Sequence, residues 1–300
     1  MFYDKITFRR ENGLEVCAIT IHNKDEFFRY SDVTRVGGVM HSHHYHNLFE
    51  MYFLTSGNCN FFIDDKVYEM VAGDLVMIPK GVIHKTNYGA EEHSRIVIEY
   101  STSFIPESLK ERFENSVYHY RNNDATKEIY SILKRIEKEQ GTPDEFTADM
   151  LYALMKMLFF CIARNKNYIT PPGLKNRMVE KVVTYIKSNY FTDITLSDTA
   201  AEYSVTPEHL SRTFKHETGF GFNEFLTLVR LQRAENMLKE EQTKKVSEIA
   251  YICGFNDSNY FSDKFKRAYG ISPLAFSKKM KAQHKENTTI IEKERKNGRK

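Results

Sequence analysis

Long apolar runs are missing from this sequence, and their absence narrows the class of protein that it encodes. The chain has 300 residues, which is enough for two or three domains of about 100–150 residues each. No apolar run reaches the ~18 residues that a membrane-spanning helix requires. The N-terminal segment MFYDKITFRR also lacks the apolar core of a secretory signal. We therefore expect a cytoplasmic protein with no membrane partner.

Cysteine is scarce as well. The four cysteines are far apart in the sequence and include no C-x-x-C pair, which argues against a disulfide framework and against a structural zinc site. We expect all four to be small buried apolar side chains in a reducing compartment. They are Cys17, Cys59, Cys161 and Cys253.

Neither sign of charge is in large excess, but the two signs are unevenly distributed. The formal net charge is +3. Residues 1–170 contain 20 Lys and Arg against 24 Asp and Glu, whereas residues 171–300 contain 23 against 16. A mildly acidic first part beside a basic second part indicates that only the second part meets a polyanion.

The first third of the chain has the pattern of β-structure. Short runs rich in β-branched and aromatic residues, at 49–57, 59–65 and 74–81, are separated by turn signals such as Ser56-Gly57. Many short strands at this spacing predict a sandwich or a barrel over residues 1–105.

Helical spacing follows in residues 106–170. Apolar residues recur at helical intervals in 125–139 and 146–165, and Gly141-Thr142-Pro143 separates the two stretches. The pattern predicts a helical hairpin. The apolar stripe on its second helix is wider than one neighbour needs, so it is either a dimer surface or part of a helix-pair core.

A linker leads to a second helical part. Pro171-Pro172-Gly173 cannot continue a helix. Residues 171–283 then show helical periodicity with few strand signals, which predicts an all-α domain. The last residues, 284–300, are basic and lack periodicity, so we expect a disordered tail.

Two segments of the all-α part, 196–219 and 246–270, repeat one another. Equivalent residues lie 50 positions apart before a central turn and 51 positions apart after it. Such a repeat rarely arises by chance. The matched pairs are Leu196 and Val246, Ala200 and Ala250, Ser204 and Gly254, Leu210 and Phe261, Phe214 and Phe265, and Gly219 and Gly270.

Each copy has the parts of a helix-turn-helix, namely a short helix, a turn and a longer helix. Thr206-Pro207 begins the longer helix of the first copy, and Asp257 or Ser258 caps that of the second. A glycine suited to the left-handed conformation ends both helices. The intervening segment 222–239 predicts a long helix that holds the two units about one DNA turn apart.

The stretch RLQRAENML, together with KVSEIAYICGFNDSNYFSDKFKRAYGISP, resembles the second DNA-binding unit of AraC/XylS-type transcription regulators. The resemblance covers residues 176–280. It implies two recognition helices that contact bases of double-stranded DNA. The positions that match base-contacting ones are Glu208, Ser211, Arg212, Ser258, Asn259, Ser262 and Asp263.

Side-chain chemistry suggests a role for several of these residues. Arg212 suits guanine and Asn259 suits adenine, whereas Glu208 and Asp263 suit cytosine N4 or a salt bridge. For each of them the alternative is an ordinary solvated surface side chain. Four basic residues are candidates for phosphate contacts, namely Lys215, Lys264, Lys266 and Arg267.

Histidines gather in the N-terminal part. The pattern G-x5-H-x-H-x3-E-x6-G runs through His44, His46 and Glu50, and the later pattern G-x5-P-x-G-x2-H ends in His84. Both resemble the paired motifs of the cupin barrel, which implies a cupin or jelly-roll-like fold. Residues two apart on a strand share a face, and in metal-dependent cupins these four positions are the metal ligands.

Three interpretations of these residues stay open. The four residues hold Zn, Mn, Fe, Co or Ni, or they line a metal-free pocket for a small organic effector, or they have no part in a pocket. Tyr52 is one of several aromatic residues near the motif that could stack on a sugar, and the alternative, which is more common for such aromatics, is a place in the core of the barrel. The resemblance suggests a sugar as the effector.

The sequence therefore predicts a regulator and not an enzyme. We expect a homodimer that binds DNA, responds to an effector such as a sugar, and activates transcription by RNA polymerase. Two rival functions remain, a metal-dependent cupin enzyme with a helical scaffold and an architectural DNA-binding protein without an effector.

Overall fold

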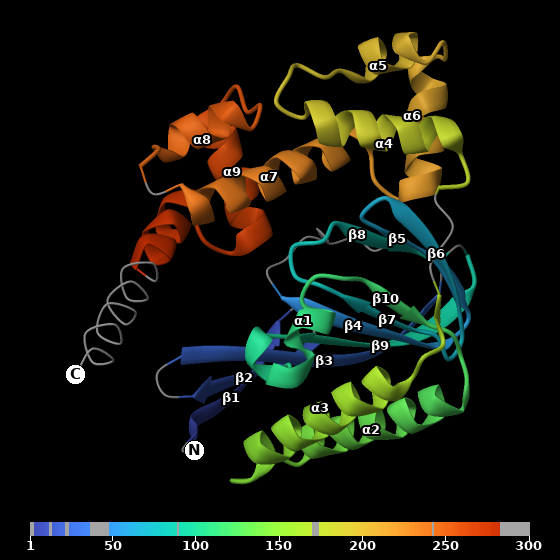
Figure 1. Ribbon diagram of the computed structural model, residues 1–300, viewed down its shortest axis with the longest axis vertical. Coiled ribbons are helices and arrows are strands. Elements are labelled where there is room, and N and C mark those ends of the chain that lie inside the picture. The colour runs from blue at the N-terminus through green and yellow to red at the C-terminus, as the bar shows by residue number, and fades with distance from the viewer. Residues whose placement is uncertain are drawn as a thin grey trace, which may run out of the picture. The chain divides into compact units, whose positions relative to one another are not determined.

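The computed structural model describes residues 3–11, 14–21, 24–36, 48–88, 90–169, 174–241 and 243–282. The chain divides into two compact units, residues 1–175 and residues 176–300 (Figure 1). In the described part, none of the helices is both long and apolar enough to cross a lipid bilayer.

The first unit is built on two antiparallel sheets. The larger sheet has the order β1-β2-β3-β9-β4-β7-β10-β11, and the smaller one has the order β6-β5-β8. The strands are β1 (Tyr3–Glu11), β2 (Leu14–Ile21), β3 (Lys24–Val36), β4 (Phe49–Ser56), β5 (Asn58–Ile63), β6 (Lys66–Val71), β7 (Leu75–Ile78), β8 (His84–Asn87), β9 (Glu92–Tyr100), β10 (Tyr118–Tyr120) and β11 (Tyr168–Ile169).

Strand β4 shows how sequence alternation assembles the layers. Phe49, Met51 and Phe53 pack in the core on the helical side of the larger sheet. Tyr52 belongs to a second core, which joins the larger sheet to the smaller one. Successive side chains of a strand point to opposite faces, so Glu50 shares the face of Tyr52. This side of the larger sheet, toward the smaller sheet, is called the inner face below.

The other face is covered by the helical hairpin that the sequence predicts. Helix α2 (Asp124–Gly141) begins with a capping box between Asn123 and Thr126, and α3 (Thr147–Arg164) follows after a short connection. Ile132 of α2 and Leu158 of α3 are fully buried in the core beneath the sheet. Shorter helical turns precede the hairpin, namely η1 (Thr102–Phe104), η2 (Glu107–Leu109) and α1 (Lys110–Phe113).

Two short strands lie in the stretch that we expected to be helical. Strand β10 pairs with β7 and with β11, and so extends the larger sheet. Both strands are only two or three residues long, which is too short for the alternation of apolar residues to stand out. The predicted cupin-like, β-rich fold is otherwise confirmed, with its strands divided between two sheets.

The second unit is all-α, as predicted (Figure 1). Its helices are α4 (Arg177–Asn189), α5 (Leu196–Glu202), α6 (Pro207–Thr218), α7 (Phe222–Glu240), α8 (Val246–Ile252) and α9 (Ser258–Tyr269). A further helical segment over 273–282 follows α9.

The internal repeat is visible in the backbone of the two turns. Ser204 and Gly254, which the repeat pairs, both adopt positive φ, 55° and 84°. In each turn a backbone N–H donates to the carbonyl of the buried alanine of the first helix, from Val205 to Ala200 and from Phe255 to Ala250, at 3.0 Å in both cases. The two helix-turn-helix units therefore share one local geometry.

The long helix α7 contributes to the cores of both helix-turn-helix copies. Near its N-terminus, Phe225 packs against the ring of Phe214 in the first copy. Near its C-terminus, Ala234 and Leu238 belong to the buried cluster of the second copy, together with Phe265. The predicted connecting helix is thus confirmed as a shared element of the two copies.

Candidate functional site

The two longer helices of the repeats, α6 and α9, begin and end as the sequence predicts. The Thr206 side chain accepts a hydrogen bond from the backbone N–H of His209 at 3.2 Å. At α9 the cap is Asp257, which accepts from the N–H groups of Asn259 and Tyr260. Gly219 and Gly270 end the helices with φ of 77° and 75°, a conformation that other residues adopt at a cost.

Helix α6 turns its apolar side inward and leaves a polar face in solvent. Leu210 and Phe214 are fully buried, whereas Glu208, Arg212 and Lys215 are exposed and Ser211 is half-buried. In the part of the chain that the structure describes, Arg212 and Lys215 form no ion pair. Both cations are therefore available to an anionic partner.

Helix α9 has the same division but a different charge arrangement. Asp263 and Arg267 form an ion pair at 3.0 Å, and the ammonium of Lys264 lies over the ring of Tyr260 at 5.2 Å. These contacts occupy two of the four basic side chains predicted to reach phosphates. Ser258, Asn259, Asp263, Lys266 and Arg267 are exposed, and Ser262 and Lys264 are half-buried.

A junction of polar contacts joins the end of α4 to α7 and to the second helix-turn-helix copy. Arg230 of α7 donates from Nε to the carbonyl of Tyr190 at 2.7 Å and from Nη2 to that of Thr192 at 2.8 Å. Burial lowers the pKa of Arg230, because it disfavours the charged form. Asn256, in the turn of the second helix-turn-helix copy, donates to Asp193 Oδ1 at 3.4 Å. The α4–α5 connection is thereby joined to α7 and to the second helix-turn-helix copy.

Sequence reasoning missed this junction, although Gly254 carries a signal of it. With φ of 84°, a β-carbon at this position would lie 2.5 Å from the Tyr190 carbonyl oxygen and 2.8 Å from Arg230 Nε. Glycine is required here by backbone conformation and by close approach together. The turn before α9 is consequently packed directly against the end of α4 and against α7.

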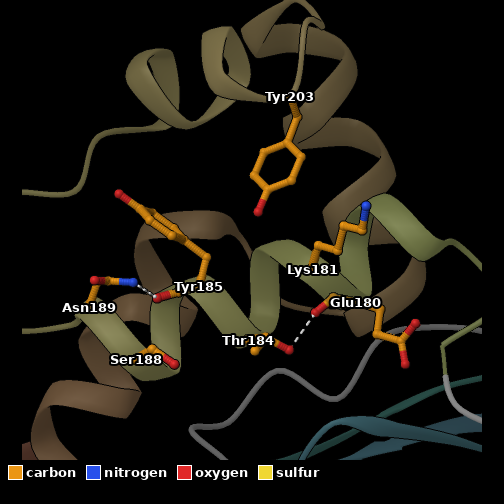
Figure 2. A pocket seen from close by; sticks show the side chains of 7 residues that line it. All are labelled: Glu180, Lys181, Thr184, Tyr185, Ser188, Asn189 and Tyr203. Atoms are coloured by element: carbon orange, nitrogen blue, oxygen red, sulfur yellow. Dashed lines mark hydrogen bonds between the residues drawn. The ribbon is translucent and has the colours of Figure 1, made fainter.

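A separate groove runs along α4 beside the end of α5 (Figure 2). Its volume is about 460 Å³. None of the residues predicted to contact DNA lines it, so we assign it no part in base recognition. Its lining consists of Glu180, Lys181, Thr184, Tyr185, Ser188, Asn189 and Tyr203.

In the first unit, the structure brings together the described members of the predicted effector site. Glu50 and His84 are both buried, and His84 Nε2 lies 3.3 Å from Glu50 Oε2. Nδ1 of His84 donates to the Val82 carbonyl at 2.8 Å. Tyr52 packs edge-on against Phe61. The other two predicted members, the histidines at 44 and 46, lie outside the described residues.

Further polar side chains face the same inter-sheet region and were not singled out from the sequence. Tyr52 and Tyr88 are joined through their hydroxyls at 2.8 Å, and the ring of Tyr88 stacks on that of His93 at 3.5 Å. Arg95 donates to His93 Nε2 at 3.2 Å. Burial raises the pKa of Tyr88 to about 12. His93 and Arg95 are two apart on β9, a spacing that could have identified them.

So many buried polar groups indicate a region built for polar recognition. Apolar side chains would fill an inter-sheet core at lower cost, because each buried polar group must keep a hydrogen bond. Together with the two recognition helices, this defines a protein with a ligand-binding β-domain and a double helix-turn-helix DNA-binding domain.

Comparison with known proteins supports the same division. The model of the AraC-like ligand binding domain matches residues 31–155, and that of a helix-turn-helix domain matches residues 199–279. The chain belongs to the AraC family of transcription regulators.

Three relatives show how far the similarity extends. The HTH-type transcriptional activator RhaR of Escherichia coli O139:H28 is 24% identical over 83% of this chain and 93% of its own length. RhaR of Mannheimia succiniciproducens is 22% identical over 78% of this chain and 86% of its own length. The regulator YijO of Escherichia coli K12 is 30% identical, and the match spans only 54% of this chain and 56% of that relative.

Proposed function

We propose that this regulator activates transcription when a small polar molecule such as a sugar binds between its two sheets. The observation that carries the proposal is the pair of matched recognition helices, held in one arrangement by Arg230 and Gly254. The relatives named as transcriptional activators support the direction of regulation. Activation implies RNA polymerase as a partner, and a DNA target places the protein in the bacterial cytoplasm.

The exposed polar face of each recognition helix supplies the proposed DNA contacts. Arg212 is exposed and without an ion pair in the described region, which suits a bidentate contact to guanine. Asn259, in the first turn of α9, suits adenine. Lys215 and Lys266 are the best phosphate contacts, because Arg267 and Lys264 already have partners within α9. The remaining proposed contacts are Glu208, Ser211, Ser258, Ser262 and Asp263.

Helix α3 supplies a proposed dimer surface. Its buried face packs against α2 and the sheet, yet four large apolar residues stay exposed on the opposite side. They recur at intervals of four, seven and three residues, a spacing that keeps them on one stripe of the helix. A second copy of α3 is the partner that such a self-complementary stripe fits. The stripe, called the α3 stripe below, consists of the N-cap Phe146 and of Met150, Met157 and Phe160.

The proposed effector contacts are Glu50, Tyr52 and His84, with His44 and His46 as further members. The same residues fit a divalent transition metal as the second possibility. A separation of 3.3 Å between Glu50 Oε2 and His84 Nε2 is compatible with two ligands of one ion at about 2.0–2.2 Å each. The other ring nitrogen of His84, Nδ1, donates a hydrogen bond to a backbone carbonyl, as the second ring nitrogen of a metal-bound histidine does. Elemental analysis of the purified protein separates the two possibilities.

The decisive experiment measures binding of the full chain to the DNA upstream of its own gene by fluorescence anisotropy. We expect sequence-selective binding whose affinity falls steeply with salt, because phosphate contacts release counterions. An Arg212→Ala/Asn259→Ala double variant should lose selectivity over a scrambled duplex. Equal affinity of the wild type for both duplexes would contradict regulation through specific sites.

The same preparation tests the rival functions. A reporter fused to that upstream DNA should respond to at least one member of a panel of neutral monosaccharides. If the reporter does not respond and the protein binds DNA without selectivity, an architectural role is favoured. Turnover of a substrate by metal-loaded protein, with no DNA binding, would favour the cupin enzyme.

A further inference from the structure

His119, the central residue of β10, faces the region between the two sheets. Its two chain neighbours contact the core on the helical side, so strand alternation places His119 on the inner face. The strand register puts it in one row with Val76 and Tyr52. Its ring is fully buried and meets the ring of Tyr68, from the smaller sheet, edge-on at 5.7 Å. His119 thus lies in the region proposed for the effector.

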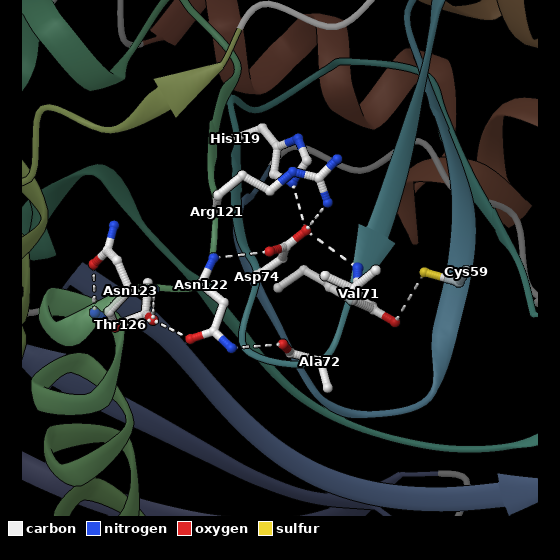
Figure 3. A network of polar contacts seen from close by, with 10 residues as sticks. Cys59, Val71, Ala72, Asp74, His119, Arg121, Asn122, Asn123 and Thr126 are labelled. Atoms are coloured by element: carbon white, nitrogen blue, oxygen red, sulfur yellow. Dashed lines mark hydrogen bonds and ion pairs between the residues drawn. The ribbon is translucent and has the colours of Figure 1, made fainter.

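Asp74 determines which nitrogen of this ring carries a proton. Its fully buried carboxylate accepts a hydrogen bond from His119 Nε2 at 3.0 Å and from Arg121 Nη1 at 2.8 Å (Figure 3). The backbone N–H groups of Val71 and Asn122 donate to it as well. Because an ionised carboxylate only accepts hydrogen bonds, Nε2 of His119 is the donor.

The charge state of Asp74 agrees with this assignment. Burial alone would raise the pKa of Asp74, but hydrogen bonds from His119, Val71 and Asn122 outweigh it and lower the pKa below its usual value. The carboxylate therefore stays ionised at neutral pH.

The second ring nitrogen of His119 is a hydrogen-bond acceptor in the neutral imidazole. In a neutral imidazole with its proton on Nε2, Nδ1 carries a lone pair. Nδ1 of His119 is buried and has no hydrogen-bond partner among the residues that the structure describes. Buried polar atoms of this kind are rare in folded proteins, and a bound molecule that donates a hydrogen bond would satisfy it.

The carboxylate that orients the histidine is also connected to the start of α2. The backbone N–H of Asn122 donates to the Asp74 carboxylate. The side-chain amide of Asn122 donates to the Ala72 carbonyl at 3.1 Å. The oxygen of the same amide accepts from the Thr126 hydroxyl at 3.2 Å. Thr126 and Asn123 form the capping box of α2, so bonded groups lead from the inter-sheet region to the helix (Figure 3).

Close packing reinforces that connection. Gly73 has φ of 90°, and a β-carbon there would lie 2.4 Å from Cγ of Asn122. The turn before β7 and the loop before α2 are therefore in direct contact. A displacement of one must be followed by the other, because packed groups leave no free volume between them.

We propose that His119 is an effector-sensing residue, whose Nδ1 accepts a hydrogen bond from a hydroxyl group of the effector while Asp74 connects that contact to the start of α2. The inference rests on the proposed function and adds a chemical restriction to it. A carboxylate or carbonyl oxygen cannot donate to Nδ1, whereas a polyol or sugar hydroxyl can. Helix α2 packs on α3, so occupation of the site reaches the helix that carries the α3 stripe.

The first test needs no effector. Long-range proton–nitrogen NMR on the full chain, labelled with ¹⁵N-histidine, reports which ring nitrogen of each histidine is protonated. His119→Gln identifies the signal by its disappearance. We expect a proton on Nε2 and none on Nδ1; a protonated Nδ1 in the ligand-free protein would overturn the inference.

The second test uses neutral monosaccharides as probes, with binding to the full chain measured by titration calorimetry. His119→Gln keeps an N–H donor for Asp74 but has no acceptor at the Nδ1 position, since its amide oxygen is bonded to the same carbon as the NH₂ group. We expect at least tenfold weaker binding of the sugar that the wild type binds best. His209→Gln, at an exposed histidine of α6, is the matched control and should bind normally. Hydrogen exchange at the first turn of α2 should slow on sugar binding in the wild type only.

The outcomes separate this inference from the proposed function. Unchanged sugar affinity in His119→Gln contradicts the role of His119 while leaving a sugar effector intact. A wild-type protein that binds no member of the panel contradicts the proposed effector class itself.

Discussion

Arg230 and Tyr190 are joined by a hydrogen bond of 2.7 Å from the guanidinium Nε to a backbone carbonyl. The two residues are 40 positions apart in the chain. Tyr190 follows α4, whereas Arg230 lies in α7, the helix that both helix-turn-helix copies share. This contact joins the end of α4 to the helix that packs against both recognition helices.

Arg230→Ala should weaken DNA binding although Arg230 is not among the proposed DNA contacts. The change leaves two carbonyls without their donor, which costs about 1–3 kcal/mol, and we expect DNA affinity to fall roughly tenfold. Arg233→Ala is the matched control, since Arg233 only lies over the Tyr190 ring at 5.5 Å. Equal losses in the two variants, measured by anisotropy, would argue against the positioning role.

Gly254→Ala should destabilise the second helix-turn-helix copy, because both the backbone conformation and the lack of space disfavour a β-carbon there. The left-handed conformation alone costs an alanine about 1–2 kcal/mol. With the clash against Tyr190, we expect the free energy of unfolding to fall by about 3 kcal/mol. Gly270→Ala is the control: its φ is also positive, but no atom lies within 4 Å of its added β-carbon. Urea unfolding should show that Gly270→Ala lowers the free energy of unfolding by only about 1 kcal/mol.

Arg212→Ala and Lys215→Ala should weaken DNA binding in different ways. Loss of a base contact is expected to remove about 1–3 kcal/mol of discrimination at one base pair. Loss of a phosphate contact should weaken binding equally on all sequences and reduce the salt slope by about 0.9. Competition against single-base variants of the operator distinguishes them. A uniform loss for Arg212→Ala would contradict its assignment to base recognition.

Asp74→Asn should change the dependence of stability on pH. Because the pKa of Asp74 is lowered in the folded protein, its stabilising effect is complete above the ordinary aspartate value of about 3.9 and is lost as pH falls through the lowered pKa. We expect the variant to be about 2 kcal/mol less stable at neutral pH, with a smaller difference below pH ~4. A difference that stays constant from pH 7 to pH 3 would show that the carboxylate charge is irrelevant.

Met157→Lys, in the middle of the α3 stripe, should disrupt the proposed dimer. Burying an unpaired charge costs about 3 kcal/mol, or roughly a hundredfold in the dimer dissociation constant. Lys156→Glu reverses a charge on the neighbouring exposed residue and should leave assembly unchanged. Light scattering after size exclusion measures both, and a Met157→Lys protein with the wild-type mass would place the interface elsewhere.

The structural features predicted correctly from the sequence are those that neighbouring residues specify. The Thr206 cap and the glycines at 219 and 270 specify where recognition helices begin and end, and all three act within one helical turn. The β-rich N-terminal part, the helical hairpin and the double helix-turn-helix were predicted correctly for the same reason. Burial of Cys59 and Cys253 was also correct, whereas Cys161 is only half-buried.

The residues that were missed depend on pairings between distant segments. Asp74 and His119 are 45 positions apart, and only the addition of β10 to the larger sheet brings them together. No periodicity reveals a three-residue strand, so its central histidine had no signal in the sequence. Glu50 and His84 were found because a known motif links them, and their partners His44 and His46 remain a prediction outside the described residues.

Helix α7 has a consequence for how the DNA-binding domain behaves as a folding unit. Its nine buried residues are divided between two cores, so neither copy of the repeat has a complete interior without it. Unfolding of either copy exposes apolar surface of the other. The two helix-turn-helix copies are therefore expected to unfold together. A chain that retained only one copy would need other apolar residues to cover the face of α7 that the lost copy buries.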